Sequence, residues 1–479
     1  MLITIATLAI PALLIPMLSA LGLKWKRFPE VATVAALFVA MMELPFVLLY
    51  SASASPQSSI WSYPSNLLSF DGISFIFCVT VILVSMMVAI SSSTMLDDDS
   101  NKPVYYSLLL FATLGMVLVS STADLIFLLV SWELMTVPSF LLVALKKRDP
   151  KANEAAVKFF LAAALSSALI LYGISLFYGV SGSTSLYVLQ SSLASLPASS
   201  SPVILLATSF LLGGFAVKMA LAPFHFWLPD TLEGAHPPVA ALLAAGSKKA
   251  GFAAALRVVV FLVLASRFVS VGPSWQIALA IMAAVTMTWG NLAALTQKSL
   301  PRLLAYSSIA QAGYIMIGLA VQGTAGAVFG LLGLLLHVLF HAVMKGSAFI
   351  SLRNIGSSMD DLAGLYKKAP LMALSFVVSL FALAGLPPLN GFWSKLFLFM
   401  GAVQGGMSWL AAVALINSAV ALGYYSYLAK RMFFDDPVTP GVKVQQPDVL
   451  AVALFALIFI VVTGLYPEPL IRLISLLTS

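Results

Sequence analysis

Seven ionisable side chains stand inside segments that are otherwise apolar, and they are the residues of this chain best placed to do chemistry. They are Glu133, Lys218, Lys248, His337, His341, Lys345 and Lys395. A charged side chain at the centre of a bilayer costs about 2.5–3.5 kcal/mol on insertion scales. One such residue is tolerable, but seven in five apolar segments indicate a polar track through an apolar body. The default interpretation of such a track is a path for protons or ions.

The composition defines the class of protein that carries this track. Of the 479 residues, 61% are hydrophobic and only 9% are charged, whereas soluble domains carry about 25% charged residues. Apolar runs of about 20 residues, each long enough to cross a bilayer, recur along the whole chain. The short alternating segments of a transmembrane barrel are absent from the sequence. We therefore expect an all-α polytopic membrane protein without a soluble domain.

Cysteine content and charge exclude other classes. The single cysteine, Cys78, predicts no disulfide and no cysteine-bound metal or iron–sulfur cluster, so we expect no cofactor in this chain. The net charge of +7 comes mostly from residues at the ends of apolar segments, so no nucleic-acid partner is expected. The first apolar stretch is preceded by no basic residue and followed by Lys24, Lys26 and Arg27. This pattern predicts a first transmembrane helix rather than a cleaved signal.

Hydropathy predicts fourteen spans, with boundaries good to about three residues. They are 2–22, 31–50, 70–91, 104–120, 124–145, 155–179, 203–227, 238–264, 273–295, 302–320, 325–352, 370–400, 408–430 and 448–467. Every second loop, counted from the first, contains basic residues, apart from one loop of this set, which is an acidic turn with Asp230 and Glu233. These cations are Lys24, Lys26, Arg27, Lys102, Lys146, Lys147, Arg148, Lys151, Lys298, Arg302, Arg353, Lys367, Lys368, Lys430, Arg431 and Lys443. The other loops hold one cation, Arg267, which predicts that the first set is cytoplasmic and both termini are external.

Two predicted spans are interrupted by proline close to a lysine. Pro223 lies within span 203–227, five residues after Lys218, and the run 385–391 lies within span 370–400, directly before Lys395. Broken helices survive in a membrane where protein or a wet cavity satisfies the freed backbone groups. The two spans run in opposite directions and lie five spans apart, which predicts two inverted five-helix repeats. The expected units are residues 1–103, the repeats 104–265 and 273–431, and a final helix with its tail at 448–479.

Glu133 and Lys218 suit an ion pair whose opening and closing changes the proton affinity of the lysine. A static bridge between two helices is the alternative. Lys248 lies about 15 Å deep in its span, where a lysine, unlike an arginine, can accept and release a proton. Its neighbour Lys249 faces about 100° away and is interpreted as a bystander or a supporting charge.

His337, His341 and Lys345 follow one another at four-residue spacing and share one helix face. Histidine titrates near neutral pH, so a proton relay is the functional interpretation. A metal site is one alternative, although the sequence shows no third ligand. Histidines that only hydrogen-bond between helices are the other.

Six further features have open or structural interpretations. His225 and His236 suit either proton uptake groups or ordinary loop residues, and Glu43 suits a contact with a neighbouring subunit. Arg257 and Lys158 are interpreted as snorkelling cations. The pair Gly326 and Gly330 is interpreted as close helix packing.

Several segments together resemble one family, the antiporter-like subunits of respiratory complex I, shared with Mrp-type sodium/proton antiporters and membrane-bound hydrogenases. They are 131–138 (SWELMTVP), 218–230 (KMALAPFHFWLPD), 233–243 (EGAHPPVAALL), 247–248, 304–314 (LAYSSIAQAGY) and 391–395 (GFWSK). Within the family, the lysine at 395, the 304–314 run and the short C-terminus most resemble subunit N.

The resemblance implies fourteen helices, two inverted repeats and a proton path along the midplane of the bilayer. By motif, it implies that Glu133 and Lys218 are a coupled pair, that Lys248 is the central relay, and that Lys395 belongs to the outer half-channel. It also implies a bacterial or archaeal cell membrane, neighbouring membrane subunits, and indirectly a peripheral redox arm with iron–sulfur clusters. The electron donor stays open among NADH, F420H2, ferredoxin and others.

The resulting hypothesis is a proton-pump module of a quinone oxidoreductase-type translocase, driven by a redox partner. The chain itself has no phosphate-binding loop and no dinucleotide fingerprint. Protons would load Lys248 from the cytoplasm through the histidine region, pass to Lys395 and leave outward, gated by Glu133 and Lys218. A subunit of a sodium/proton antiporter, and an inert scaffold, are the rival hypotheses.

Overall fold

The computed structural model describes residues 1–21, 26–53, 67–96, 100–146, 148–195, 200–264, 274–438 and 445–478. Within these ranges the regular structure is helical, with three isolated β-bridges, which confirms the all-α class. Four of the predicted loop cations lie outside the described residues, namely Lys24, Lys147, Arg267 and Lys443.

The first part of the chain forms eleven numbered helices and one π-helix. They are α1 (Leu2–Ala20), α2 (Phe28–Ser53), α3 (Gly72–Ser91), α4 (Lys102–Ser120), α5 (Leu125–Val143), α6 (Pro150–Ser181), α7 (Leu186–Ser195), α8 (Ser201–Met219), α9 (Trp227–Gly234), α10 (Pro237–Ala241), the π-helix Leu242–Ser247 and α11 (Lys248–Leu264). Short polar side chains begin several of them. Asp124, for example, accepts from the backbone of Ile126 and Phe127 at the start of α5, as expected of an N-cap.

The second part contains α12 (Ser274–Leu295), α13 (Leu300–Ala320), α14 (Ala327–Ile355), a 3-10 turn (Asp360–Leu362), α15 (Leu365–Lys368), α16 (Pro370–Ala384), α17 (Asn390–Gln404), α18 (Ser408–Phe433), α19 (Pro447–Leu465) and α20 (Glu468–Thr478). Thirteen helical stretches among the described residues are long and apolar enough to cross a membrane. The shorter α16 continues after a break into α17. Counted together as one interrupted span, they bring the total to the fourteen predicted.

Both predicted helix breaks are present. The helix that carries Lys218 ends at Met219 and resumes at Trp227, and the later one ends at Ala384 and resumes at Asn390. Helical structure continues past the predicted end of the seventh span at residue 227, because α9 runs to Gly234. The acidic residues Asp230 and Glu233 therefore lie on a helix and not in a turn.

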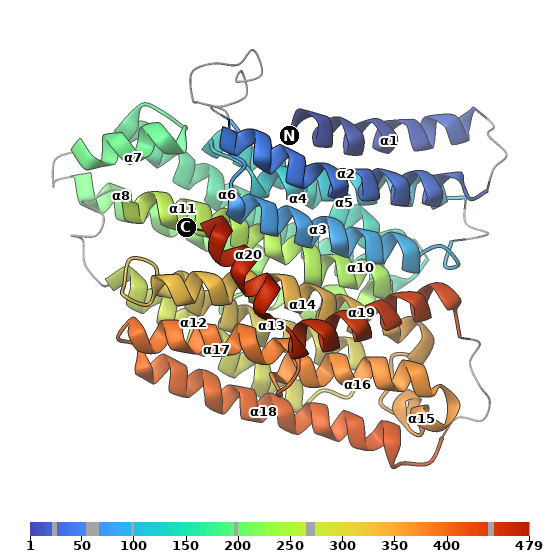
Figure 1. The fold of residues 1–479 in the computed structure, drawn as a ribbon. Helices are drawn as coiled ribbons and strands as arrows, with labels where there is room; N and C mark the ends of the chain where they lie inside the picture. Colours follow the sequence, from blue (N-terminus) through green and yellow to red (C-terminus); the bar gives the residue numbers. More distant parts are fainter. Residues whose placement is uncertain are drawn as a thin grey trace.

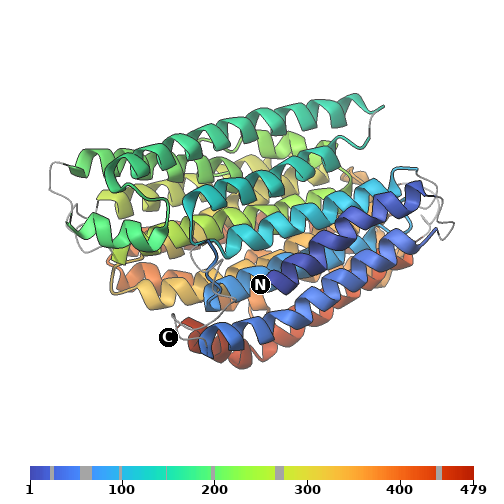
Figure 2. The same cartoon turned by 90° about the horizontal axis from the view of Figure 1, so that it is seen from above.

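The helices run side by side, with the N-terminal helices and α16 to α18 on opposite sides and α10, α11, α13 and α14 between them (Figure 1). Figure 2 shows the long α6 along another edge of the bundle. Burial follows this arrangement. In the segment Pro237–Val260, every residue of the most apolar stretch is buried inside the protein. In α1, only about a fifth of the corresponding residues are buried. The middle of the molecule is therefore packed on all sides by protein.

Glycines allow the closest helix approaches around this middle. A Cβ atom on Gly326 would lie 1.9 Å from the carbonyl oxygen of Gly401, and one on Gly330 would lie 2.1 Å from Val321. The packing interpretation of this glycine pair is confirmed.

Two helices were not anticipated. The region 181–202 was expected to be a loop, but it contains α7. The C-terminal tail forms α20, which crosses α3 and α14 obliquely (Figure 1) and brings Leu477 against Gly72.

Candidate proton path

The six basic side chains singled out above are all buried: Lys218, Lys248, His337, His341, Lys345 and Lys395 are at most 3% exposed. Glu133 is partly buried. The six basic side chains are therefore enclosed by protein. This arrangement is needed if the charges are to be hydrogen-bonded within the membrane.

Glu133 and Lys218 do not meet as a direct ion pair in this structure. Ser167 on α6 donates a hydrogen bond to Glu133, and the Lys218 ammonium donates to Thr136, one turn further along α5, over 3.1 Å. Lys218 also lies 4.9 Å from the centre of the Phe159 ring. The two groups therefore have separate hydrogen-bond partners.

The break after α8 keeps Lys218 inside the protein. Ala220 adopts a left-handed conformation with φ of 53°, and the backbone amide of Ala222 donates to Thr286 on α12. Trp227 donates to the carbonyl of Val217 over 2.9 Å. On the other side, a Cβ atom on Gly251 would lie 3.7 Å from the Lys218 side chain, so α11 packs directly along that lysine.

Two lysines from different helices converge on neighbouring serines of α13. Lys248, the first residue of α11, donates to the Ser308 carbonyl over 2.9 Å and faces its hydroxyl at 3.3 Å. Lys345 on α14 donates to the hydroxyl of Ser307 over 2.6 Å and to the carbonyl of Leu304 over 3.2 Å. Ser307 also hydrogen-bonds Tyr425 of α18. The segment 304–314 was singled out by resemblance only, and its hydroxyls and backbone carbonyls are the acceptors for both lysines.

One turn further along α13, Gln311 contacts the first histidine. Its Oε1 lies 3.1 Å from Nε2 of His337, while Nδ1 of that ring lies 2.9 Å from the hydroxyl of Ser394 on α17. His337 thus connects the two helices through hydrogen bonds. The centre of the His341 ring lies 5.8 Å from that of His337, and neither of its ring nitrogens has a hydrogen-bond partner among the residues that the structure describes. Within the described ranges, no third His, Cys, Asp or Glu joins these two in a metal-binding group.

Lys395 lies at the second break. Its ammonium donates to the carbonyl of Ala384 over 2.9 Å and to Ser418 over 2.7 Å, and it lies 4.3 Å from the centre of the Tyr314 ring. In an unbroken helix, the Ala384 carbonyl would accept from residue 388, but Pro388 has no amide hydrogen. The proline therefore leaves an acceptor that the lysine uses.

The remaining candidates occupy varied surroundings. His225 packs near Trp289, with ring centres 5.7 Å apart, and its Nδ1 has no hydrogen-bond partner within the described ranges. Lys158 does not merely snorkel, since it pairs with Asp230 at 2.5 Å and with Glu154 at 2.6 Å. Arg302 pairs with the same Asp230 at 2.6 Å. Through these pairs, Asp230 on α9 joins α6 to α13.

The snorkelling interpretation of Arg257 is wrong. This side chain is 3% exposed and donates to the carbonyls of Ser120 and Ser69 and to Asp71. It therefore joins α11 to the ends of α3 and α4. Glu43 accepts a hydrogen bond of 2.8 Å from Thr7 on α1, a partner within its own chain.

Lys249, which the sequence analysis interpreted as a bystander or a supporting charge, has a fully buried side chain. Its side chain is 1% exposed, and its ammonium lies 6.0 Å from the centre of the Phe252 ring. The sequence could have indicated this, since Lys249 follows Lys248 in a segment with apolar residues on every side.

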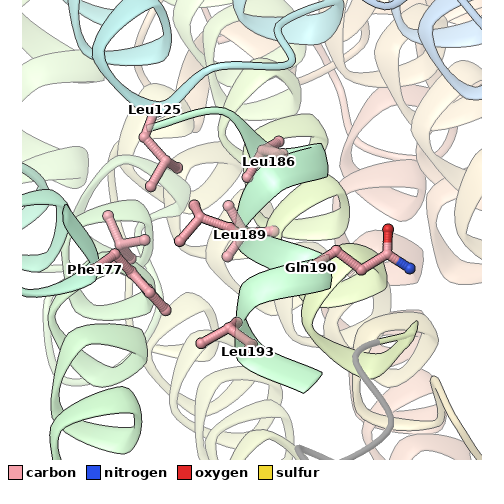
Figure 3. Close-up of a pocket in the computed structure, with 8 residues that line it drawn as sticks. Leu125, Phe177, Leu186, Leu189, Gln190 and Leu193 are labelled. Carbon is pink, nitrogen blue, oxygen red and sulfur yellow. The ribbon is translucent and has the colours of Figure 1, made fainter. Parts of the chain in front are cut away.

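An apolar cavity of about 10 Å³ lies beneath α7, away from these groups. Figure 3 shows Leu125, Phe177, Leu189 and Leu193 around it, with the amide of Gln190 turned away. Its volume is close to that of one water probe sphere, and its lining is apolar. It does not contribute to the polar track.

Comparison with known proteins gives the family. Residues 122–421 match the model of the NADH:quinone oxidoreductase/Mrp antiporter transmembrane family. The chain belongs to this family. F420H2 dehydrogenase subunit N of Methanosarcina mazei is 40% identical over 456 residues, which cover 92% of this chain and 89% of that protein. NADH-quinone oxidoreductase subunit N of Desulfitobacterium hafniense is 37% identical, covering 83% of this chain and 82% of the relative.

A chain of respiratory complex I from Thermus thermophilus, solved with bound aureothin, has the same fold as this antiporter-family member. Its TM-score is 0.81 at 33% identity, and the match covers 98% of this chain and 99% of that one. The predicted family and the polytopic membrane fold are confirmed.

Proposed function

We propose that this chain is the proton-translocating membrane subunit, of the subunit N type, of a complex I-like respiratory complex. The observation that carries the proposal is the meeting of Lys248 and Lys345 at Ser307 and Ser308 of α13. From there, the same helix leads through Gln311 to His337, whose other partner, Ser394, directly precedes Lys395. Titratable groups thus follow one another from the centre of the molecule to the second break.

The energy for pumping comes from partner subunits. Moving one charge against 100 mV takes about 2.3 kcal/mol, and we propose that this chain carries no cofactor of its own. The named relatives are subunits of an F420H2 dehydrogenase and of an NADH-quinone oxidoreductase. Either electron donor, F420H2 or NADH, is compatible with a chain that receives its energy from neighbouring membrane subunits and, indirectly, from a peripheral arm with iron–sulfur clusters. The whole assembly would reside in a bacterial or archaeal cell membrane.

Protons would enter from the cytoplasm, load Lys248, pass by way of the two histidines to Lys395 and leave on the outer side. In this proposal, the separate partners of Glu133 and Lys218 would correspond to the open state of their pair, and closure of the pair would hold a proton on the lysine. Breaks beside Lys218 and Lys395 support the two inverted repeats, 104–265 and 273–431, as the two half-channels. Both termini would then be external.

A sodium/proton antiporter subunit is the second candidate, since Mrp antiporters belong to the same family. The inner groups of the path are lysine and histidine nitrogens, whereas hard cations such as Na⁺ prefer oxygen ligands. The path therefore favours protons.

The test uses the assembled complex in inverted membrane vesicles, where electron transfer and proton uptake are measured together. Lys218→Ala, Glu133→Ala and Lys248→Met should each reduce proton uptake per electron while the subunits still copurify. Lys367→Met is the matched control, because that lysine is exposed and pairs with Asp436 at the surface. Full proton uptake in all three variants would overturn the proposal. Sodium-driven pH changes without an electron donor would support the antiporter instead.

A further inference from the structure

A groove of about 440 Å³ lies between α16 and α18, and none of its lining residues belongs to the proposed proton path. Val377 and Phe381 line it from α16, and Ala429 and Phe433 line it from the end of α18. These helices form one side of the bundle, opposite the N-terminal helices (Figure 1). The walls are therefore mostly apolar, and the volume falls within the range of about 300–1,000 Å³ that small-ligand sites occupy.

The membrane restricts what such a groove can hold. α18 is long and apolar enough to span the bilayer, and α16 is the first half of the interrupted span. Contact of apolar walls with water is unfavourable, whereas the hydrocarbon chains of lipids surround the apolar outer face of a membrane protein. An acyl chain is therefore the occupant that walls of this composition favour.

Lys430 adds a positive charge to the lining of the groove. Its side chain is exposed. Neighbouring cations are neutralised within the protein, since Lys367 pairs with Asp436 at 2.6 Å. In the same way, Arg431 pairs with Asp360 at 3.0 Å. Lys430 forms no ion pair with another residue of the described ranges, so its charge is available to an external anion.

The charge and the groove are arranged like the two parts of a phospholipid. Phe381 lies about 16 Å from the start of α16, at 1.5 Å per residue, and lines the inner part of the groove. Lys430 lies in the last turn of α18, at the end that the charge pattern predicts to be cytoplasmic. Near that end, Phe433 stacks on Tyr366 of α15, with ring centres 4.9 Å apart, which holds one wall in place. Basic pockets between membrane helices on the cytoplasmic side suit anionic headgroups.

We propose that this groove binds one anionic phospholipid of the cytoplasmic leaflet, with an acyl chain between α16 and α18 and its phosphate paired with Lys430. The inference goes beyond the proposed function, because it depends on neither proton movement nor the electron donor. A helix of a neighbouring subunit is the rival occupant. Such a helix would leave Lys430 without a counter-ion unless it carried an acidic residue at the same height, whereas the lipid supplies both the apolar chain and the charge.

The test uses the purified assembled complex and two photoreactive lipids, a phosphatidylglycerol and a phosphatidylcholine, each with a diazirine near the end of one acyl chain. The complex is illuminated in vesicles of otherwise neutral lipid, and labelled peptides are identified by mass spectrometry. Phosphatidylglycerol should label peptides of α16 and α18 about tenfold more strongly than phosphatidylcholine does. Lys430→Met should remove this preference and Lys430→Arg should retain it. Ala429→Phe, which narrows the groove, should reduce labelling by both lipids.

Lys367→Met is the matched control, because it removes a neighbouring cation that Asp436 already neutralises, and its labelling should equal that of the wild type. Equal labelling by the two lipids in the wild type, or an unchanged preference in Lys430→Met, would overturn the proposal. A loss of preference in Lys367→Met as large as in Lys430→Met would also overturn it, since general surface charge would then explain the effect.

The rival occupant gives a different result. If neither lipid labels the groove and Ala429→Cys is crosslinked to a neighbouring subunit by a short bifunctional reagent, protein occupies the site and the lipid proposal fails. Copurification of the other subunits with each variant checks correct assembly. Proton uptake per electron in the same preparations tests the proposed function separately, so that the two proposals can fail independently.

Discussion

Gln311 determines which ring nitrogen of His337 carries a hydrogen. The Gln311 amide nitrogen donates to the Leu383 carbonyl over 2.8 Å, so its oxygen faces Nε2 of His337 and can only accept. Nε2 must therefore bear the hydrogen, and Nδ1 is the nitrogen that gains or loses a proton. Nδ1 faces the Ser394 hydroxyl, which also lies 3.1 Å from the Gly391 carbonyl. The hydroxyl donates to Nδ1 when the ring is neutral and to Gly391 when the ring is charged.

Removing either partner should therefore slow proton passage through His337. Gln311→Leu leaves a buried N–H group without an acceptor, and Ser394→Ala removes the hydroxyl that serves both protonation states. An unsatisfied buried polar group costs about 1–3 kcal/mol, and 1.4 kcal/mol corresponds to about tenfold. We expect roughly tenfold slower proton uptake per electron, measured in vesicles of the assembled complex. Ser375→Ala is the control, because that buried hydroxyl has no hydrogen-bond partner in the described part of the chain. Equal effects of Ser394→Ala and Ser375→Ala would contradict the role assigned to Ser394.

A side chain at Gly385 should disturb Lys395. Gly385 has φ of 90°, and a Cβ atom there would lie 2.8 Å from Cδ of Lys395. The backbone conformation alone costs a non-glycine residue about 1–2 kcal/mol. Gly385→Ala should lower the thermal unfolding midpoint and reduce proton uptake together. Gly423→Ala on α18 serves as the matched control, since, apart from its own stretch of helix, no atom of the described residues lies within 4 Å of its added methyl group. Wild-type behaviour of Gly385→Ala would show that the break does not position the lysine.

The ion pairs of Asp230 predict a pH dependence of stability at the end of the first broken helix. Burial acts to raise the pKa of Asp230, but hydrogen bonds from Lys158 and Arg302 outweigh it and hold this pKa below its usual value. The unfolded chain therefore binds the proton more tightly, so the stabilisation is present above the unfolded pKa near 3.9 and is lost as pH falls through the folded pKa. Asp230→Asn should lower the unfolding midpoint at pH 7, and the difference from wild type should shrink toward pH 3.

The corresponding control is Asp436→Asn, which removes an exposed pair with Lys367 at the surface. Because exposed pairs contribute little, its unfolding midpoint should stay near that of wild type at every pH. A constant difference between Asp230→Asn and wild type from pH 7 to pH 3 would mean that packing, and not charge, is responsible.

The membrane orientation can be measured with engineered cysteines, because the single native Cys78 is buried. Ala325 and Ser357 are exposed in loops at the two ends of α14, and the charge pattern predicts an external and a cytoplasmic side for them, respectively. An impermeant maleimide should label Ala325→Cys in intact cells and Ser357→Cys in inverted vesicles. The opposite labelling pattern would reverse the proposed direction of proton movement.

The sequence by itself determined the class, the spans and the two helix breaks. Apolar runs of bilayer length need no tertiary information, because a helix in lipid must satisfy its own backbone. Pro223 and Pro388 break their helices through a local cause, the missing amide hydrogen. The ionisable residues of the path are also recognisable from local sequence, because their neighbours along the chain are apolar. These features depend on residues within one or two turns of each other.

Only the tertiary structure decided which groups meet. The hydrogen bonds of Lys248 to Ser308 and of Lys345 to Ser307 join residues 60 and 38 positions apart, and helix packing sets them. The same holds for the separation of Glu133 from Lys218, since Ser167 and Thr136 compete as partners across two helix interfaces. Close packing in three dimensions also decides the π-helix, the burial of Lys249 and the position of α20. The local sequence pattern does not specify which helices become neighbours or how each helix is rotated about its axis.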